Sequence, residues 1–142
     1  MFKKLQRRRN QKGFTLIEIL IVVVIVAILA AISVPIYLEY VKSARASDAK
    51  TAISSIWQAA QVYYQERGHY PGTVEELQDA NYVQVQASTL LQWTFQIVGD
   101  PPTAINAQST DQMAGGAGAE VRYDIARGTW AGYGLPEPDE GQ

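Results

Sequence analysis

Few residues in this sequence have the types and spacing that catalysis requires. The single histidine, His69, stands in a Gly-His-Tyr-Pro turn, and no serine or acid is spaced around it as in a catalytic triad. The sequence contains no cysteine, which excludes thiol chemistry and a disulfide framework. Neither a phosphate-binding glycine loop nor a zinc-ligand spacing is present. The sequence therefore predicts a protein that is not an enzyme.

Three aspartates offer the only pattern that suggests a metal. Asp100, Asp111 and Asp124 could supply oxygen ligands for calcium. Their spacing matches no compact calcium-binding loop, and solvated or turn-capping acids are the alternative interpretation. We therefore expect no cofactor and leave calcium as an open possibility.

A single carboxylate, Glu18, stands in an otherwise uncharged apolar run from Phe14 to Val34. At about 1.5 Å per residue, a helix of this length crosses a bilayer core of about 30 Å. An ionisable group inside a membrane is costly, so Glu18 should have a polar or cationic partner in its working state. The alternative is that Glu18 lies near the lipid headgroups and is only tolerated there.

The charge distribution around the apolar run predicts its orientation in a membrane. Six of the twelve basic residues precede it, namely Lys3, Lys4, Arg7, Arg8, Arg9 and Lys12. The excess of Lys and Arg places the N-terminus in the cytoplasm and the rest of the chain outside. An ordinary secretory signal peptide cut near Ala31 is the competing interpretation. Glu18, the length of the run and a helical pattern that continues past Ala31 argue against it.

The chain after Gly13 is acidic, although the whole sequence has a net charge of only −2. It keeps six basic against fourteen acidic residues, a net charge of −8. This balance argues against binding to nucleic-acid phosphates as the main role. With 142 residues in all, we expect one small domain plus an appendage.

The apolar run continues into an amphipathic helix. Pro35 removes one helical hydrogen bond and favours a kink or local unwinding, and Gly68 predicts the end of the helix after Arg67. Residues 14–67 would then form one helix whose first half has no partner within the chain, so lipid or copies of itself must cover it. The apolar stripe of the second half contains Ala49, Ile53, Ile56, Ala60 and Tyr63.

The sequence from Gly68 onward predicts a small α+β head. Thr73 and Glu76 have the spacing of a capping box, which predicts a short helix through Leu77. Alternating apolar residues predict an antiparallel sheet of about three strands, packed on the apolar stripe of the long helix. The predicted strands are residues 91–97, 121–125 and 130–133.

Two segments of the head carry no such pattern. Residues 99–118 contain two prolines and a glycine-rich stretch, so we expect an exposed and mobile loop. Residues 134–142 are rich in acids and proline, and we expect them to be disordered.

The residues Gly13-Phe14-Thr15-Leu16-Ile17-Glu18, with a short basic leader before them and Pro35 after them, resemble the processing site of type IV pilins and of type II secretion pseudopilins. The resemblance implies that a prepilin peptidase cuts between Gly13 and Phe14 and methylates the new amino group of Phe14. It also implies that Glu18 neutralises the Phe14 amino group of a neighbouring subunit, and that Pro35 lets the helix adapt during packing.

In organisation, this resemblance implies a cleaved leader (1–13), a long helix with a transmembrane segment (14–34) and an amphipathic segment (35–67), a head (68–133) and a tail (134–142). The subunit would be held in the inner membrane by lipid, with its N-terminus inside and its head exported. An assembly platform and an assembly ATPase would then build a homo-oligomeric helical filament.

Within this family, a surface pilus subunit for adhesion, motility or DNA uptake competes with a pseudopilin of a short periplasmic pseudopilus. The fuller consensus of the major pseudopilin after Tyr70-Pro71 is absent, which favours the pilus. The third possibility is a signal-anchored extracytoplasmic binding protein, which would not be cut at Gly13.

Overall fold

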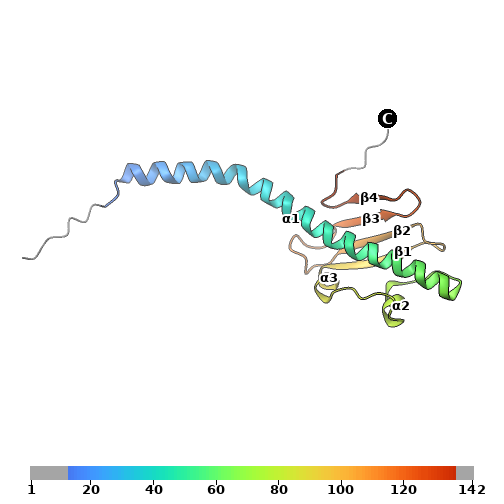
Figure 1. Ribbon diagram of the computed structural model, residues 1–142. Helices are drawn as coiled ribbons and strands as arrows, with labels where there is room; N and C mark the ends of the chain where they lie inside the picture. Colours follow the sequence, from blue (N-terminus) through green and yellow to red (C-terminus); the bar gives the residue numbers. More distant parts are fainter. Residues whose placement is uncertain (1–12, 137–142) are drawn as a thin grey trace, which may run out of the picture. The chain divides into compact units, whose positions relative to one another are not determined.

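The computed structural model describes residues 13–136 (Figure 1). The predictions made for the basic residues before Gly13 and for residues 137–142 lie outside the described residues. The chain divides into two units, Met1–Tyr37 and Leu38–Gln142. Each unit is described by itself below.

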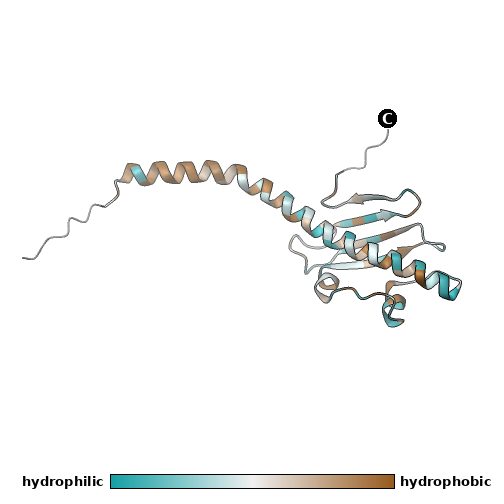
Figure 2. Cartoon of the chain, viewed as in Figure 1, coloured by the Kyte–Doolittle hydropathy of each residue, from teal (hydrophilic) through white to brown (hydrophobic). Residues whose placement is uncertain are grey.

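The first unit contains the beginning of helix α1 (Leu16–Arg67). Every side chain from Phe14 to Tyr37 is exposed within the chain, and Figure 2 shows this part of α1 as predominantly hydrophobic. By length and composition, α1 is able to cross a membrane, and none of its most apolar window is buried. The structure thus supplies no covering for the apolar run from within the described chain.

In the second unit, α1 buries one stripe of small and aliphatic side chains in the core of the head. The buried positions are Ala46, Ala49, Ala52, Ile53, Ile56, Ala59, Ala60 and Tyr63. Their spacing of three and four residues places them on one face of the helix. The helix ends at Arg67, where Gly68 adopts a φ of 80° and its amide donates to the Tyr64 carbonyl at 2.8 Å, a glycine-terminated helix end.

Two short helices follow α1. In α2 (Val74–Asp79) the Thr73 hydroxyl accepts a hydrogen bond from the Glu76 amide at 3.2 Å, so the predicted N-cap is confirmed. The Glu76 carboxylate accepts from the Gly72 amide at 2.9 Å instead of the Thr73 amide. The second short helix, α3 (Ala87–Gln92), has no side-chain cap and was not predicted.

A four-stranded antiparallel sheet completes the head, with the strand order β1-β2-β3-β4. Its strands are β1 (Trp93–Val98), β2 (Ala104–Ser109), β3 (Glu120–Asp124) and β4 (Thr129–Gly132). The face toward α1 is apolar and contributes Trp93, Ile97, Ile105, Ala107 and Val121 to the core. The predicted fold class, a long helix packed by its second half on a small antiparallel sheet, is confirmed (Figure 1).

The prediction of a loop over residues 99–118 was wrong in its first part. Ala104–Ser109 forms β2, which pairs with β1 on one side and β3 on the other. The sheet therefore has four strands instead of three, and β2 connects the strands that were predicted. The predicted strand at 91–97 begins two residues later because Leu91 belongs to α3.

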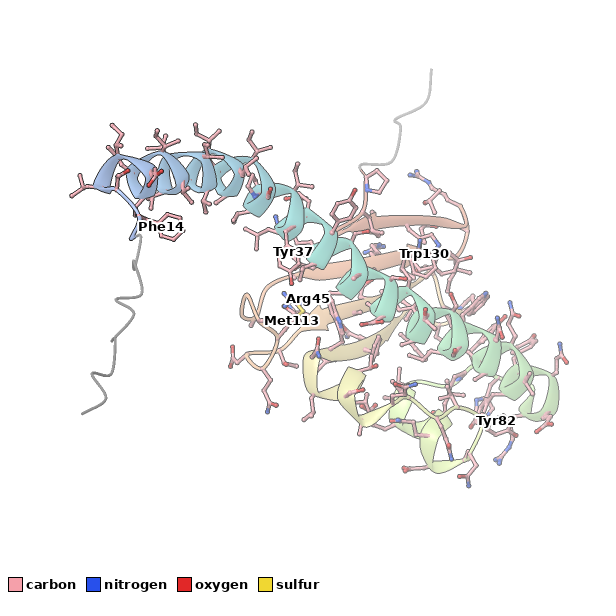
Figure 3. The ribbon with its side chains drawn as sticks, turned by 60° about the vertical axis from the view of Figure 1, so that its left-hand side comes forward. Phe14, Tyr37, Arg45, Tyr82, Met113 and Trp130 are labelled. Carbon is pink, nitrogen blue, oxygen red and sulfur yellow. The ribbon has the colours of Figure 1, made fainter. Side chains whose placement is uncertain are left out.

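Residues 110–118, the rest of the predicted loop, are anchored to the head. The side chain of Met113 is only 3% exposed, and the Arg45 guanidinium donates to the carbonyl of Ala114. Figure 3 labels Arg45 and Met113 where this loop meets α1. The buried hydroxyl of Ser109 donates to the Gly116 carbonyl at 3.0 Å and accepts from the Ala119 amide at 2.8 Å. These contacts tie the glycine-rich loop to the core.

The prediction of disorder from residue 134 onward was wrong for residues 134–136. We call residues 133–136 the C-terminal strap. The Tyr133 amide donates to the Glu120 carbonyl at 2.7 Å, and Leu135 packs half-buried on the core. Gly134 lies so close to α1 that a Cβ there would be 2.5 Å from the Lys42 carbonyl oxygen. In this cysteine-free chain, packing of the strap on α1 closes the head.

Candidate functional site

The beginning of α1 is built by a reciprocal pair of hydrogen bonds between Thr15 and Glu18. The Thr15 amide donates to Glu18 Oε2 at 2.7 Å, and the Glu18 amide donates to Thr15 Oγ1 at 3.3 Å. This is a capping box, which satisfies two amide donors at the helix start. The Thr-x-x-Glu spacing is visible in the sequence, but our sequence interpretation assigned no role to Thr15.

Glu18 therefore has a polar partner within its own chain, and the side chain remains exposed. Among residues 13–136, the one ion pair joins Lys42 to Glu39, so no cation of the described chain neutralises Glu18. A carboxylate offers about four acceptor positions on its two oxygens. The capping bond to Thr15 thus leaves Glu18 able to accept further hydrogen bonds from a cationic donor.

The other residues singled out in the motif lie on either side of this cap. Gly13 and Phe14 precede the helix in a segment without regular structure, and Phe14 is 83% exposed. Pro35 lies inside α1, and the helix continues through it. The structure thus brings Phe14, Thr15 and Glu18 together at one helix end and places Pro35 about five turns further along.

The candidate calcium ligands are not brought together. Within residues 13–136 no group of three or more histidine and acidic side chains is placed to hold a metal ion. Asp124 instead caps the turn after β3, because its Oδ1 accepts from the Arg127 amide at 2.9 Å. His69 has its Nδ1 3.1 Å from the Tyr70 carbonyl oxygen and packs edge-on against the Tyr63 ring, with the ring centroids 5.4 Å apart.

A second polar cluster joins α2 to the end of α1. The Tyr63 hydroxyl donates to Glu76 Oε1 at 2.5 Å, and the Tyr82 hydroxyl donates to Glu66. The bond from Tyr63, followed by that from the Gly72 amide, lowers the pKa of Glu76 below its ordinary value of 4.5. The same hydrogen bond to Glu76 raises the pKa of Tyr63 above its ordinary value of 10.0. The sequence gave no sign of this pairing, which depends on the fold.

The N-terminal segment matches a known family. Residues 8–34 match the prokaryotic N-terminal methylation motif. Over 68 residues the chain is 36% identical to the type IV major pilin protein PilA of Myxococcus xanthus, and over 62 residues it is 45% identical to a fimbrial protein of Neisseria meningitidis. Over 72 residues it is 43% identical to the type II secretion system core protein G of Pseudomonas aeruginosa.

These similarities cover about half of this chain, 48%, 44% and 51% respectively. The matched parts span only 31% of the Myxococcus pilin, 36% of the Neisseria protein and 51% of the secretion protein. The methylation motif overlaps the exposed apolar start of α1, and an α+β head follows the helix. The N-terminal half of this chain is therefore similar to type IV pilins and to a type II secretion core protein.

Proposed function

We propose that this chain is the structural subunit of a type IV pilus-like filament on the cell surface, and that its role is polymerisation and not catalysis. The observation that carries the proposal is the apolar start of α1, whose side chains from Phe14 to Tyr37 are all exposed within the chain. Such a helix needs lipid or other helices around it. Inner-membrane lipid covers it before assembly, and the helices of neighbouring subunits cover it afterwards.

Processing at the start of α1 prepares the subunit for assembly. A prepilin peptidase removes residues 1–13 and methylates the amino group of Phe14, which lies in an exposed segment just before the helix. Glu18 then pairs with the Phe14 amino group of a neighbouring subunit. Opposite charges attract far more strongly in a low-dielectric environment than in water, so this pair sets the register of one helix on the next.

Membrane orientation and assembly machinery complete the proposed role. The basic leader keeps the N-terminus in the cytoplasm, and the head, residues 68–133, is exported. An inner-membrane platform and an assembly ATPase extract the subunit from the lipid. Pro35 cannot donate a helical hydrogen bond, so α1 adapts there when subunits pack.

The second candidate is a pseudopilin of a type II secretion system. It is favoured by the 43% identity to the secretion core protein G over 72 residues. The same processing and the same helix packing would then build a short periplasmic fibre instead of a surface pilus.

Shearing of cells that express wild-type, Glu18→Ala and Glu39→Ala chains tests the proposal. We expect the wild-type chain in the sheared surface fraction and the Glu18→Ala chain, processed but unassembled, in the membrane fraction. Glu39→Ala is the matched control, because Glu39 is an exposed acid of the same helix whose partner is Lys42 of its own chain, and it should assemble normally.

Each fraction has a defined meaning. Abundant surface filaments built from the Glu18→Ala chain would overturn the docking role of Glu18. A wild-type chain that is processed but found only in membranes would favour the pseudopilin over the surface pilus.

A further inference from the structure

The head part of α1 has two unlike flanks, one on either side of its buried stripe. Asp48 and Lys50 are two residues apart, so they point in directions roughly 200° apart around the helix. Figure 1 shows α2 and α3 on one side of α1 and β3 and β4 on the other. We call these two surfaces the α3 flank and the β4 flank.

The α3 flank combines a polar groove with an apolar ridge. Its groove has a volume of about 210 Å³ and lies between α1, at Asp48, Thr51 and Ser55, and residues 84–89. Directly after this segment, Leu90 is 38% and Leu91 55% exposed. Two large apolar side chains that are consecutive in the chain and both exposed indicate a contact surface.

The β4 flank presents a cation over an aromatic ring. Lys50 Nζ lies 5.0 Å from the centroid of the Trp130 ring, which is labelled on β4 in Figure 3. Lys50 and Trp130 are both half-buried, so both still have surface that a neighbour is able to cover. β4 is also an edge strand of the sheet, so no further strand of residues 13–136 lies beyond it.

Asp48 on the α3 flank and Lys50 on the β4 flank carry opposite charges. Within residues 13–136 the one ion pair is Lys42 with Glu39, so Asp48 and Lys50 have no ionic partner there. They do not face each other on their own helix. They do lie at nearly the same height, about 3 Å apart along the helix axis. A second copy placed beside the first therefore brings Asp48 of one chain to Lys50 of the other.

We propose that the α3 flank of one head docks on the β4 flank of the next copy of this chain, with Asp48 facing Lys50 and Leu90 and Leu91 against Trp130. This inference rests on the proposed filament role and names the contact between heads. Because the two surfaces differ, a row of bound copies keeps one unoccupied flank at each of its two ends. Such a heterologous contact adds subunits without pairing them off, as an open helical filament requires.

Charge reversal tests this contact. Asp48→Lys and Lys50→Asp each place like charges opposite one another between copies, so each should reduce sheared filaments about tenfold. The double variant Asp48→Lys/Lys50→Asp restores opposite charges between copies, and we expect filament yield to return toward the wild-type level. Pairing within one chain cannot explain such a rescue, because positions 48 and 50 point apart.

The rescue decides the outcome. A double variant that yields no more filament than the single variants, or single variants that assemble like the wild type, would overturn the contact. If the wild-type chain itself forms no filaments, the proposed function fails. If wild-type filaments form and the rescue fails, only the contact between heads is lost.

Cross-linking within intact filaments tests the same contact without relying on variants that could fail to fold. The chain has no cysteine, so in Asp48→Cys/Lys50→Cys a short bis-maleimide reagent joins only the two introduced thiols. We expect a ladder of covalent multimers in filaments of the double variant, and none with Asp48→Cys alone. Intact filaments of the double variant that give no ladder would contradict the proposal.

Discussion

At the scale of single residues, Glu18 serves local structure at the start of α1, and we propose that it also docks a neighbouring subunit. Glu18 caps the helix through the Thr15 amide at 2.7 Å while its side chain remains exposed. The motif itself could be predicted from the sequence because a lone carboxylate in an apolar run is conspicuous. Its hydrogen bonds follow from the Thr-x-x-Glu spacing. What would cover Glu18 in the proposed filament depends on neighbouring copies and is not encoded locally.

The capping box predicts a measurable effect of Thr15. Thr15→Val keeps the shape of the side chain but removes the hydroxyl that accepts from the Glu18 amide, so the helix start should lose about 1 kcal/mol. Hydrogen exchange of the Glu18 backbone amide, measured on the full chain in detergent micelles, should become faster. Thr15→Ser retains the hydroxyl and should exchange like the wild type. Equal protection in the Val and Ser variants would show that the cap contributes nothing.

The bond between Tyr63 and Glu76 predicts how the head responds to pH. Glu76 has a folded pKa below 4.5, so its stabilising contribution is present above about pH 4.5 and is lost as the pH falls through the lowered value. Tyr63 has a folded pKa above 10.0, so its contribution is present below pH 10 and is lost as the pH rises further.

Thermal unfolding of the full chain across this pH range checks the expectation. Wild-type Tm should fall on both the acid and the alkaline side, and Tyr63→Phe, which removes the donor to Glu76, should flatten both slopes. Tyr64→Phe is the control, because Tyr64 is an exposed neighbour that no described hydrogen bond joins to Glu76. Parallel curves for wild type and Tyr63→Phe would mean that this bond does not govern the response.

At the scale of elements, the strands and helices differ in how far local sequence specifies them. β1 and β3 alternate apolar and polar residues and were predicted to within two residues at their starts. β2 was missed because its sequence, Ala-Ile-Asn-Ala-Gln-Ser, is rich in small and amide residues of low strand propensity. It is a strand because both of its edges find partners in β1 and β3. α3 was missed because six residues without a side-chain cap give no periodic signal.

The C-terminal strap shows the same dependence on tertiary structure. Gly134 and Gly128 share one backbone conformation, because both adopt a φ of 66°. A Cβ at Gly134 would lie 2.5 Å from the Lys42 carbonyl oxygen, whereas one at Gly128 would meet nothing within 4 Å. The close approach of the strap to α1 thus distinguishes the two positions.

This difference makes Gly134→Ala and Gly128→Ala a matched pair. Both substitutions carry the cost of a left-handed backbone, about 1–2 kcal/mol. Gly134→Ala adds the overlap with α1, so we expect a further loss of about 1–3 kcal/mol in the free energy of unfolding. Denaturant unfolding of the full chain in detergent measures both. Equal losses for the two variants would show that the strap is not held against α1.

At the scale of the whole molecule, the chain is an acidic head attached to an apolar helix that its own fold leaves uncovered. This division could be predicted from the sequence, because the apolar run and the six basic residues before it require no tertiary information. The choice between a surface pilus and a pseudopilus could not, because it depends on what the heads contact. We propose one such contact, between the unlike flanks around Asp48 and Lys50, and charge reversal tests it.

We propose that the chain is cut after Gly13 and assembled through the new terminus. A Cβ at Gly13 would meet nothing within 4 Å in this structure, so a Gly13→Val variant should fold and yet fail at the peptidase. It should keep its leader and stay in the membrane. This variant is the negative control for the measurement on wild-type material.

That measurement is mass spectrometry of the N-terminal peptide from filaments sheared off cells that express the wild-type chain. We expect a peptide that begins at Phe14 and carries a methyl group on its amino nitrogen. A peptide that still contains Gly13, or one that begins near Ala31, would contradict the account.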